Sequence, residues 1–220
     1  MSRLARAGAT LVTGLSTALV LGALAVLLFL NPAWVGFAQE RAEAAAWTGF
    51  ESADLRAATN AILADLVLGP PDFDVAVDGR PVLNAREIGH MQDVRAVFGA
   101  FFAVAAAAAV VLVVLRWRAG DPGRFWRWVG AGGFALAVGT VVLGGLGLAF
   151  FDAAFELFHR LFFAEGSWTF DPRTERLVQL FPYQFWIETT VALGAVLVVA
   201  GAALGWWARR RDVRPTGGRA

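Results

Sequence analysis

The chain has 220 residues, of which 58% are hydrophobic, and it holds 18 Phe and 9 Trp against a single Tyr. This apolar fraction is too high for a typical soluble domain. The absence of cysteine excludes disulfides, thiolate metal sites and a cysteine nucleophile, and the net charge of +1 excludes a bulk attraction to nucleic acid.

Four apolar stretches are long enough to cross a bilayer as helices, which takes roughly 20 residues each. They predict an all-α membrane protein that forms a single integral membrane domain over residues 1–220. The predicted spans are residues 8–30, 96–115, 128–151 and 185–207. The first stretch follows two arginines, as a signal peptide would. Its apolar core is longer than the about 7–15 residues of a signal peptide, so we expect it to remain as an anchor.

The arginines predict how these spans are oriented, because all 19 basic residues are Arg. The segments before the first span, between the second and third, and after the fourth hold 11 Arg and only two acidic residues. The remaining segments hold 8 Arg and 16 acidic residues. The arginine-rich side of a membrane protein is the cytoplasmic side. We therefore expect both termini and the tail 208–220 in the cytoplasm, with loops 31–95 and 152–184 on the outer face.

Small residues inside the spans suggest where helices touch, because they let backbones approach closely in lipid. Gly201 and Gly205 form a G-x-x-x-G pair in the fourth span. The third span holds a further group of glycines, at Gly139, Gly144, Gly145 and Gly147. Since glycine is also simply common in membrane helices, helix contact and background composition are equally good interpretations.

The first outer loop, residues 31–95, has the pattern of folded structure. Ser52 can cap a helix that ends before the Gly-Pro-Pro at 69–71. Weak alternation around Asp78-Gly79 predicts a small hairpin. Asn84 is placed to cap a further helix that leads into the second span.

The second outer loop, residues 152–184, begins with an amphipathic helix. Phenylalanines recur at helical spacing from Phe151 to Phe162, while Asp152, Glu156 and His159 share another face. This pattern is typical of a helix that lies on a membrane surface. The following "LVQLF" at 177–181 is apolar, and we expect it to dip into the same interface.

The two histidines of the chain, His90 and His159, both fall on the outer side near the ends of spans. Each has a carboxylate three residues before it, Glu87 or Glu156. Three interpretations remain open on the residues alone: interfacial histidines paired with carboxylates, a di-metal site of the E-x-x-H type to which Glu188 would add a ligand, or a catalytic base. No Ser elbow, P-loop, zinc-protease or dinucleotide motif is present.

Two blocks of sequence around these histidines resemble a known family. "REIGHMQDVRAVF" is similar to the E-x-x-H-M-x-D-V block that begins the second span in a family of four-span bacterial membrane proteins. "FHRLFFAEGSWTFDPRTERLVQLFPYQFW" resembles its second block. The family includes the lipoprotein intramolecular transacylase. The blocks cover about 40 residues, and the order of the spans extends the resemblance over the rest of the chain.

The resemblance implies an enzyme of the bacterial cytoplasmic (inner) membrane, with its active site on the extracytoplasmic face. It would move the sn-2 acyl chain of a diacylglyceryl lipoprotein to the α-amine of the N-terminal Cys, giving the lyso-form. The implied partners are such lipoproteins and membrane lipids, without nucleic acid, and no metal or cofactor is implied. The chain departs from the expected pattern at Glu175, where we expect Asp, and at Tyr183, where an acid is expected.

The implied site residues follow the two blocks. We take His159 as the general base and His90 as the proton donor or oxyanion partner, although the two roles could be exchanged. No covalent enzyme intermediate is needed, because amine and ester belong to one substrate. The supporting or substrate-positioning residues are Glu87, Met91, Asp93, Glu156, Trp168 and Glu188. The alternative function is a non-catalytic membrane accessory protein whose outer loops bind a partner.

Overall fold

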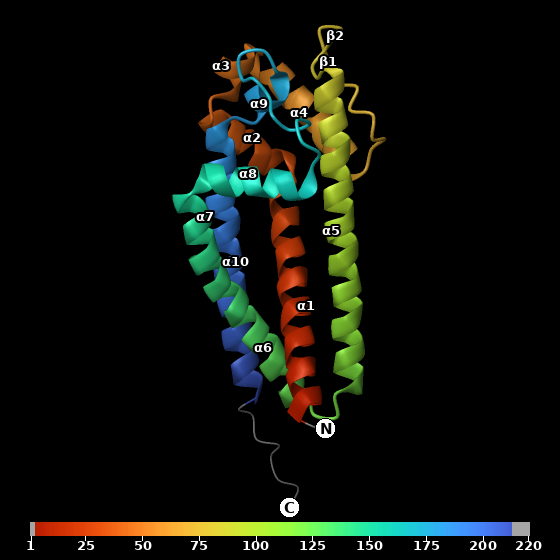
Figure 1. Ribbon diagram of the computed structural model, residues 1–220, viewed down its shortest axis with the longest axis vertical. Helices are drawn as coiled ribbons and strands as arrows, with labels where there is room; N and C mark the ends of the chain where they lie inside the picture. Colours follow the sequence, from red (N-terminus) through yellow and green to blue (C-terminus); the bar gives the residue numbers. More distant parts are fainter. Residues whose placement is uncertain (1–2, 213–220) are drawn as a thin grey trace, which may run out of the picture. The chain divides into compact units, whose positions relative to one another are not determined.

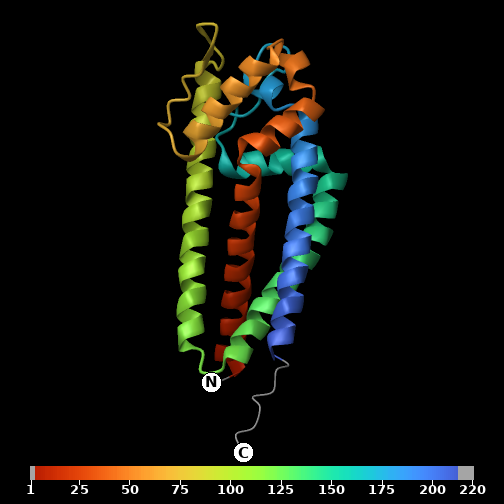
Figure 2. The same cartoon turned by 180° about the vertical axis from the view of Figure 1, so that it is seen from behind.

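The computed structural model describes residues 3–212, so residues 213–220 of the predicted cytoplasmic tail lie outside the described part. This part of the chain is mostly helical, with one two-stranded hairpin, as Figures 1 and 2 show. The all-α membrane fold predicted from the sequence is confirmed. The elements are α1 (Arg3–Phe29), α2 (Pro32–Arg41), α3 (Ala44–Thr48), α4 (Ser52–Val67), β1 (Ala76–Val77), β2 (Arg80–Pro81), α5 (Ala85–Arg118), α6 (Pro122–Gly139), η1 (Thr140–Gly144), α7 (Gly145–Ala149), α8 (Phe151–Phe162), α9 (Arg176–Leu180) and α10 (Tyr183–Asp212).

Within residues 3–212, four stretches of helix are long and apolar enough to cross a membrane, and each contains most of a predicted span. They are Ala7–Phe29, Ala85–Arg118, Pro122–Ala149 and Tyr183–Arg211. The second is much longer than the apolar run at 96–115, because a polar segment from Ala85 onward continues the same helix. The third is interrupted by the π-helical turn η1, which a sequence pattern of period 3.6 does not reveal.

The chain forms two compact units, each of which we describe by itself. The span unit comprises residues 3–25, 101–146 and 194–212. Its helices α6 and α10 meet at glycines: a Cβ added to Gly133 would lie 2.7 Å from the Gly201 oxygen, and one added to Gly201 would lie 2.5 Å from the Gly133 oxygen. The G-x-x-x-G pair is therefore a helix contact. At Gly139, Gly145 and Gly147 an added Cβ would meet no heavy atom within 4 Å, which favours the background-composition interpretation there.

The histidine unit comprises residues 26–100 and 147–193. Its hydrophobic core is formed by α3, α4, the hairpin, the start of α5 and α9, with Phe73, Ile62 and Leu180 almost fully buried. The hairpin turns at Asp78 and Gly79, whose φ angles of 51° and 70° fit the expected tight turn. Ser52 is the first helical residue of α4 and not its cap, a position that Glu51 takes without a side-chain hydrogen bond.

Two further segments of this unit carry the second outer loop. Helix α8 runs crosswise to the neighbouring parts of α5 and α10 (Figure 1) and exposes large apolar side chains, among them Leu157, Leu161 and Phe162. The amphipathic helix is thus as predicted. The expectation that "LVQLF" dips into the membrane interface is wrong, because Leu177 and Leu180 of α9 are buried in the core of the unit.

Candidate active site

His90 and His159 lie side by side in the histidine unit. Their ring centroids are 6.0 Å apart and the ring planes meet at 23°. His90 lies near the start of α5 and His159 near the end of α8, and their exposed fractions are 6% and 9%. Folding therefore buries together two histidines that are 69 positions apart in the sequence.

Helix α8 itself determines which nitrogen of His159 is free. The Nδ1–H donates a hydrogen bond to the carbonyl oxygen of Phe155, one turn earlier, over 2.8 Å. A carbonyl can only accept, so Nδ1 carries the proton and Nε2 keeps its lone pair. Burial lowers the pKa of His159, although the hydrogen bond to Phe155 acts in the opposite direction. The ring is therefore a neutral base with Nε2 available.

Aromatic side chains surround both rings. Phe155 lies 4.0 Å from His159 between ring centroids, and Phe163 lies 4.8 Å from His90 and 5.4 Å from His159. Phe170 lies 5.4 Å from His90, and Trp168 lies 4.9 Å from His159. An apolar environment disfavours a positive charge on an imidazole and strengthens any hydrogen bond made inside it.

Two polar atoms at this site are buried without a hydrogen-bond partner. They are Nδ1 of His90 and Nε1 of Trp168. Buried polar groups are nearly always paired in folded proteins, so such atoms need an explanation such as a ligand. Both atoms belong to residues whose rings lie against His159. The site therefore has unused hydrogen-bonding capacity beside a neutral imidazole base.

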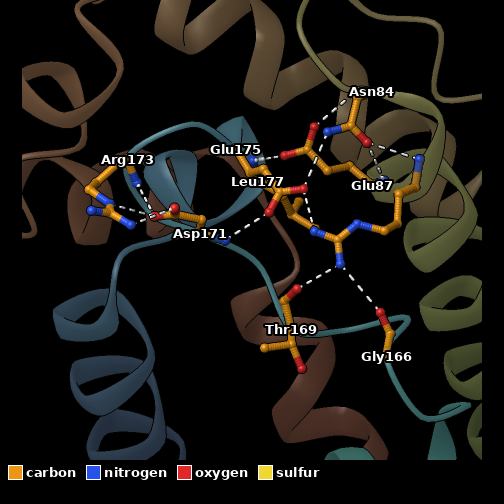
Figure 3. A network of polar contacts seen from close by, with 9 residues as sticks. Asn84, Glu87, Gly166, Thr169, Asp171, Arg173, Glu175 and Leu177 are labelled. Carbon is orange, nitrogen blue, oxygen red and sulfur yellow. Dashed lines mark hydrogen bonds and ion pairs between the residues drawn. The ribbon is translucent and has the colours of Figure 1, made fainter.

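Glu87 lies where it was expected, one turn before His90, but its carboxylate serves the backbone. One oxygen accepts from the Asn84 N–H at 2.7 Å and the other from the Leu177 N–H at 2.6 Å (Figure 3). Asn84 in turn accepts from the Glu87 N–H at 3.0 Å, which completes a capping box at the start of α5. Glu87 is 1% exposed and joins α5 to α9. Asn84 thus has the capping role predicted for it.

Arg86, which sequence reasoning missed, is the centre of a polar network in the same region. Its partners Gly166, Thr169 and Glu175 are labelled in Figure 3. Its guanidinium donates to the carbonyl oxygens of Gly166 (3.3 Å) and Thr169 (2.7 Å) and to Glu175 (2.5 Å). Glu175 also accepts from the Asp171 N–H at 2.7 Å. Glu175, which stands where Asp was expected, therefore anchors loop 164–175 through these contacts. Nothing local in the sequence marks Arg86, because its partners are about 80 to 90 positions away.

The other predicted supporting residues fall in different places. Met91 is buried in the hydrophobic core, and Asp93 is exposed and acts on His90 electrostatically. Glu156 is exposed and pairs with Arg160 at 2.5 Å. Glu188 accepts two hydrogen bonds from Arg41, at 2.6 and 2.9 Å. The structure thus brings Trp168 to the histidines and gives Glu156 and Glu188 arginine partners elsewhere.

A metal site would require several ligands at one point. Within residues 3–212, the structure gathers no group of three or more His, Asp or Glu side chains that could hold a metal ion. Glu87 and Glu156, which the E-x-x-H spacing offered as ligands, are engaged by backbone N–H groups and by an arginine, respectively.

Comparisons with known proteins agree with the resemblance. The model of the family described as lipoprotein intramolecular transacylase Lit matches residues 11–186. An uncharacterized protein from Aquifex aeolicus (strain VF5) is 28% identical over 126 residues, which make up 56% of this chain and 55% of that protein. The chain thus spans about half the length of the curated relative that it matches.

Solved structures with the same fold include the membrane integral lipoprotein intramolecular transacylase Lit from Bacillus cereus. It is 18% identical, with a TM-score of 0.76 over 96% of this chain and 97% of that one. A variant of the same protein with one histidine replaced by arginine is also 18% identical, with a TM-score of 0.72 over 94% and 92%. At this identity the match establishes a common fold.

Proposed function

We propose that this protein, which belongs to the lipoprotein intramolecular transacylase family, transfers the sn-2 acyl chain of a diacylglyceryl lipoprotein to the α-amine of its N-terminal cysteine. The product is the N-acyl, S-monoacylglyceryl lyso-form. The observation that carries the proposal is the pair of buried histidines in which Nε2 of His159 is free to take a proton. The family supplies the identity of the substrate.

The residues suit the proton transfers that this reaction needs. The neutral amine nitrogen attacks the carbonyl carbon of the sn-2 ester, an N–C bond forms, and the proton of the amine passes to Nε2 of His159. The imidazolium of His159 passes its proton to the neighbouring His90. When the tetrahedral intermediate collapses, the ester C–O bond breaks and the glyceryl oxygen takes this proton from the His90 imidazolium, so that both rings end neutral. General acid–base catalysis of this kind contributes typically about 10²–10⁴-fold.

No nucleophile of the enzyme takes part, because the amine and the ester belong to one substrate molecule. Holding the two groups in a near-attack geometry supplies much of the acceleration, and effective molarities for such reactions reach about 10⁵–10⁸ M. This accounts for a chain without cysteine and without a serine elbow.

The protein is a multi-pass membrane protein, and we place it in the bacterial cytoplasmic membrane as one integral domain. The arginine distribution supports cytoplasmic termini and an active site on the extracytoplasmic face. Membrane lipids are then its immediate neighbours, and the apolar side chains exposed on α8 fit a position at the lipid surface.

Mass spectrometry of a lipoprotein N-terminus tests the function. The protein would be expressed in a bacterial host that lacks lipoprotein N-acylation, as wild type, His90→Asn, His159→Asn and the exposed control Arg56→Gln. We expect the lyso-form from the wild type and the control only, with equal amounts of all four proteins in the membrane. A free α-amine in every strain would refute the transacylase activity. A fully active histidine variant would refute the assigned role of that histidine.

A further inference from the structure

The indole N–H of Trp168 is the feature of the site that the acid–base step leaves unused. Its Nε1 is buried and has no hydrogen-bond partner. An indole nitrogen is a donor only, and when it is buried it usually finds an acceptor. Whatever satisfies this atom must therefore present an acceptor, such as a carbonyl oxygen, and cannot be an amine or another donor.

The position of the ring places this donor beside the base. The Trp168 and His159 rings are 4.9 Å apart between centroids and inclined at 34°. His159 uses Nδ1 for its bond to Phe155, so the nitrogen left for a substrate is Nε2. An ester whose attacking amine is in reach of Nε2 has its carbonyl close to the indole, because the two rings are neighbours. The donor and the base therefore serve neighbouring atoms of one reacting group.

The loop that carries Trp168 is held from both sides. Arg86 donates to the carbonyl oxygens of Gly166 and Thr169, which flank the tryptophan (Figure 3). The same guanidinium pairs with Glu175 and lies over the Phe170 ring, 4.6 Å from its centroid. A forked, planar guanidinium can make these contacts at once, which an ammonium cannot. The indole is thus fixed before substrate arrives, as electrostatic catalysis requires.

We infer that the Nε1–H of Trp168 donates a hydrogen bond to the carbonyl oxygen of the acyl group under transfer, and that Arg86 is the positioning residue that holds it there. As the N–C bond forms, the carbonyl π electrons move onto this oxygen, and the indole stabilises the resulting oxyanion. When the ester C–O bond breaks, the C=O double bond forms again, and its carbon is now bonded to the amide nitrogen. The inference rests on the proposed function, because it assigns the oxyanion of that reaction to a donor.

Replacing the indole N–H without changing its shape tests the role in turnover. In 3-benzothienylalanine a sulfur stands where tryptophan has N–H, so the ring system remains while the donor is lost. Introduced at position 168, it should lower kcat by about 10²–10³-fold, the cost of removing one oxyanion donor, with little change in KM. Arg86→Lys should lower kcat in the same direction. Trp47→Phe, at a side chain that is 52% exposed, is the control and should retain wild-type turnover. Full kcat with the benzothienyl residue would overturn the inference.

A titration gives a second answer that does not depend on turnover. The indole proton of Trp168 is identified in ¹⁵N-tryptophan-labelled protein as the resonance missing in Trp168→Phe. We expect a synthetic diacylglyceryl lipopeptide to move it downfield, and an analogue with an ether in place of the sn-2 ester, which lacks the carbonyl, to leave it in place. No shift with the ester, or equal shifts with both, would overturn the inference. A wild-type protein that shifts with the ester but makes no lyso-form would refute the proposed function and leave the indole donor standing.

Discussion

His159 is oriented by the backbone of its own helix, through the 2.8 Å hydrogen bond from its Nδ1–H to the carbonyl oxygen of Phe155. In many hydrolases a carboxylate performs this task. Here the nearest carboxylate in the helix, Glu156, is exposed and bound to Arg160. A neutral acceptor fixes the tautomer without adding a negative charge that would stabilise the imidazolium. The ring therefore stays neutral in its aromatic surroundings, which suits a base that takes a proton only during the reaction.

The pH dependence should show this neutrality. Burial lowers the pKa of His159, so the base remains unprotonated below its ordinary value of 6.5. The free substrate amine has a pKa of about 7.7–8.0, so kcat/KM should fall from about pH 8 downward with the amine. A second loss, caused by His159, should appear only below pH 6.5. Steady-state rates between pH 5 and 9 measure both limbs. Two limbs that both lie above pH 6.5 would contradict this account.

The same shift has a consequence for stability. A histidine with a lowered pKa binds fewer protons in the folded state than in the unfolded state, so stability is unaffected above pH 6.5 and is lost as the pH falls below it. The midpoint of thermal unfolding in detergent should therefore drop below pH 6.5 in the wild type and less in His159→Asn. An equal drop in both proteins would rule out His159 as the source.

Glu87 should act on stability through the two N–H groups that it binds. In Glu87→Gln one of them, on Asn84 or Leu177, would face an amide NH₂ in a position that is 1% exposed. An unsatisfied buried donor costs about 1–3 kcal/mol. We expect a lower unfolding midpoint with an unchanged pH profile of the remaining activity. If Glu87 instead oriented His90, the pH profile would shift while the midpoint stayed constant.

The contact between α6 and α10 predicts a difference between two alanine substitutions in one span. A Cβ at Gly133 would lie 2.7 Å from the Gly201 oxygen, whereas one at Gly139 would meet no heavy atom within 4 Å. Gly133→Ala should destabilise the protein by about 1–3 kcal/mol through overpacking. Gly139→Ala should be neutral or mildly stabilising. Unfolding curves in detergent compare them, and equal stabilities would contradict the close approach of these helices.

The proposed topology can be tested cleanly because the chain has no cysteine. Single cysteines at the exposed positions Ala76 and Ala164 should react with a membrane-impermeant maleimide in intact spheroplasts. A cysteine at the exposed Gly120 should react only after the membrane is permeabilised. Labelling of Gly120→Cys in intact spheroplasts would reverse the orientation inferred from the arginines.

The membrane fold could be predicted from sequence because its signals are local. Runs of about 20 apolar residues mark the spans, and Asn84 with Glu87 three positions later marks the start of α5. Contacts between distant segments have no such signal. The partners of Arg86 lie about 80 to 90 positions further along the chain. The G-x-x-x-G pair of α10 contacts Gly130 and Gly133 of α6, and the point at which the two helices cross determines this pairing.

The candidate site shows the same division. Span ends and arginine counts predict that both histidines lie on the outer side of the membrane, and the structure confirms that the two rings lie side by side. Glu87 and Glu156 were expected to support the histidines, because E-x-x-H spacing places each carboxylate on the same helix face as its histidine. Periodicity specifies which side chains are neighbours within a helix, but not which partner from another segment reaches them first. Glu87 accepts a hydrogen bond from the Leu177 N–H, 90 positions away. His159 is oriented by the backbone carbonyl of Phe155, a group that carries no signal in the sequence.

The most direct test of the central claim follows one acyl chain through the reaction. Purified protein in lipid would receive a synthetic diacylglyceryl lipopeptide with a deuterated sn-2 chain, mixed with an unlabelled lipopeptide of different peptide sequence. We predict a product of unchanged total mass that carries the deuterated chain on its own α-amine nitrogen, stable to mild base, with no label on the second peptide. A deuterated chain that stays on the glyceryl oxygen, with the α-amine still free, would contradict the account. Label on the second peptide would show that the transfer is not intramolecular.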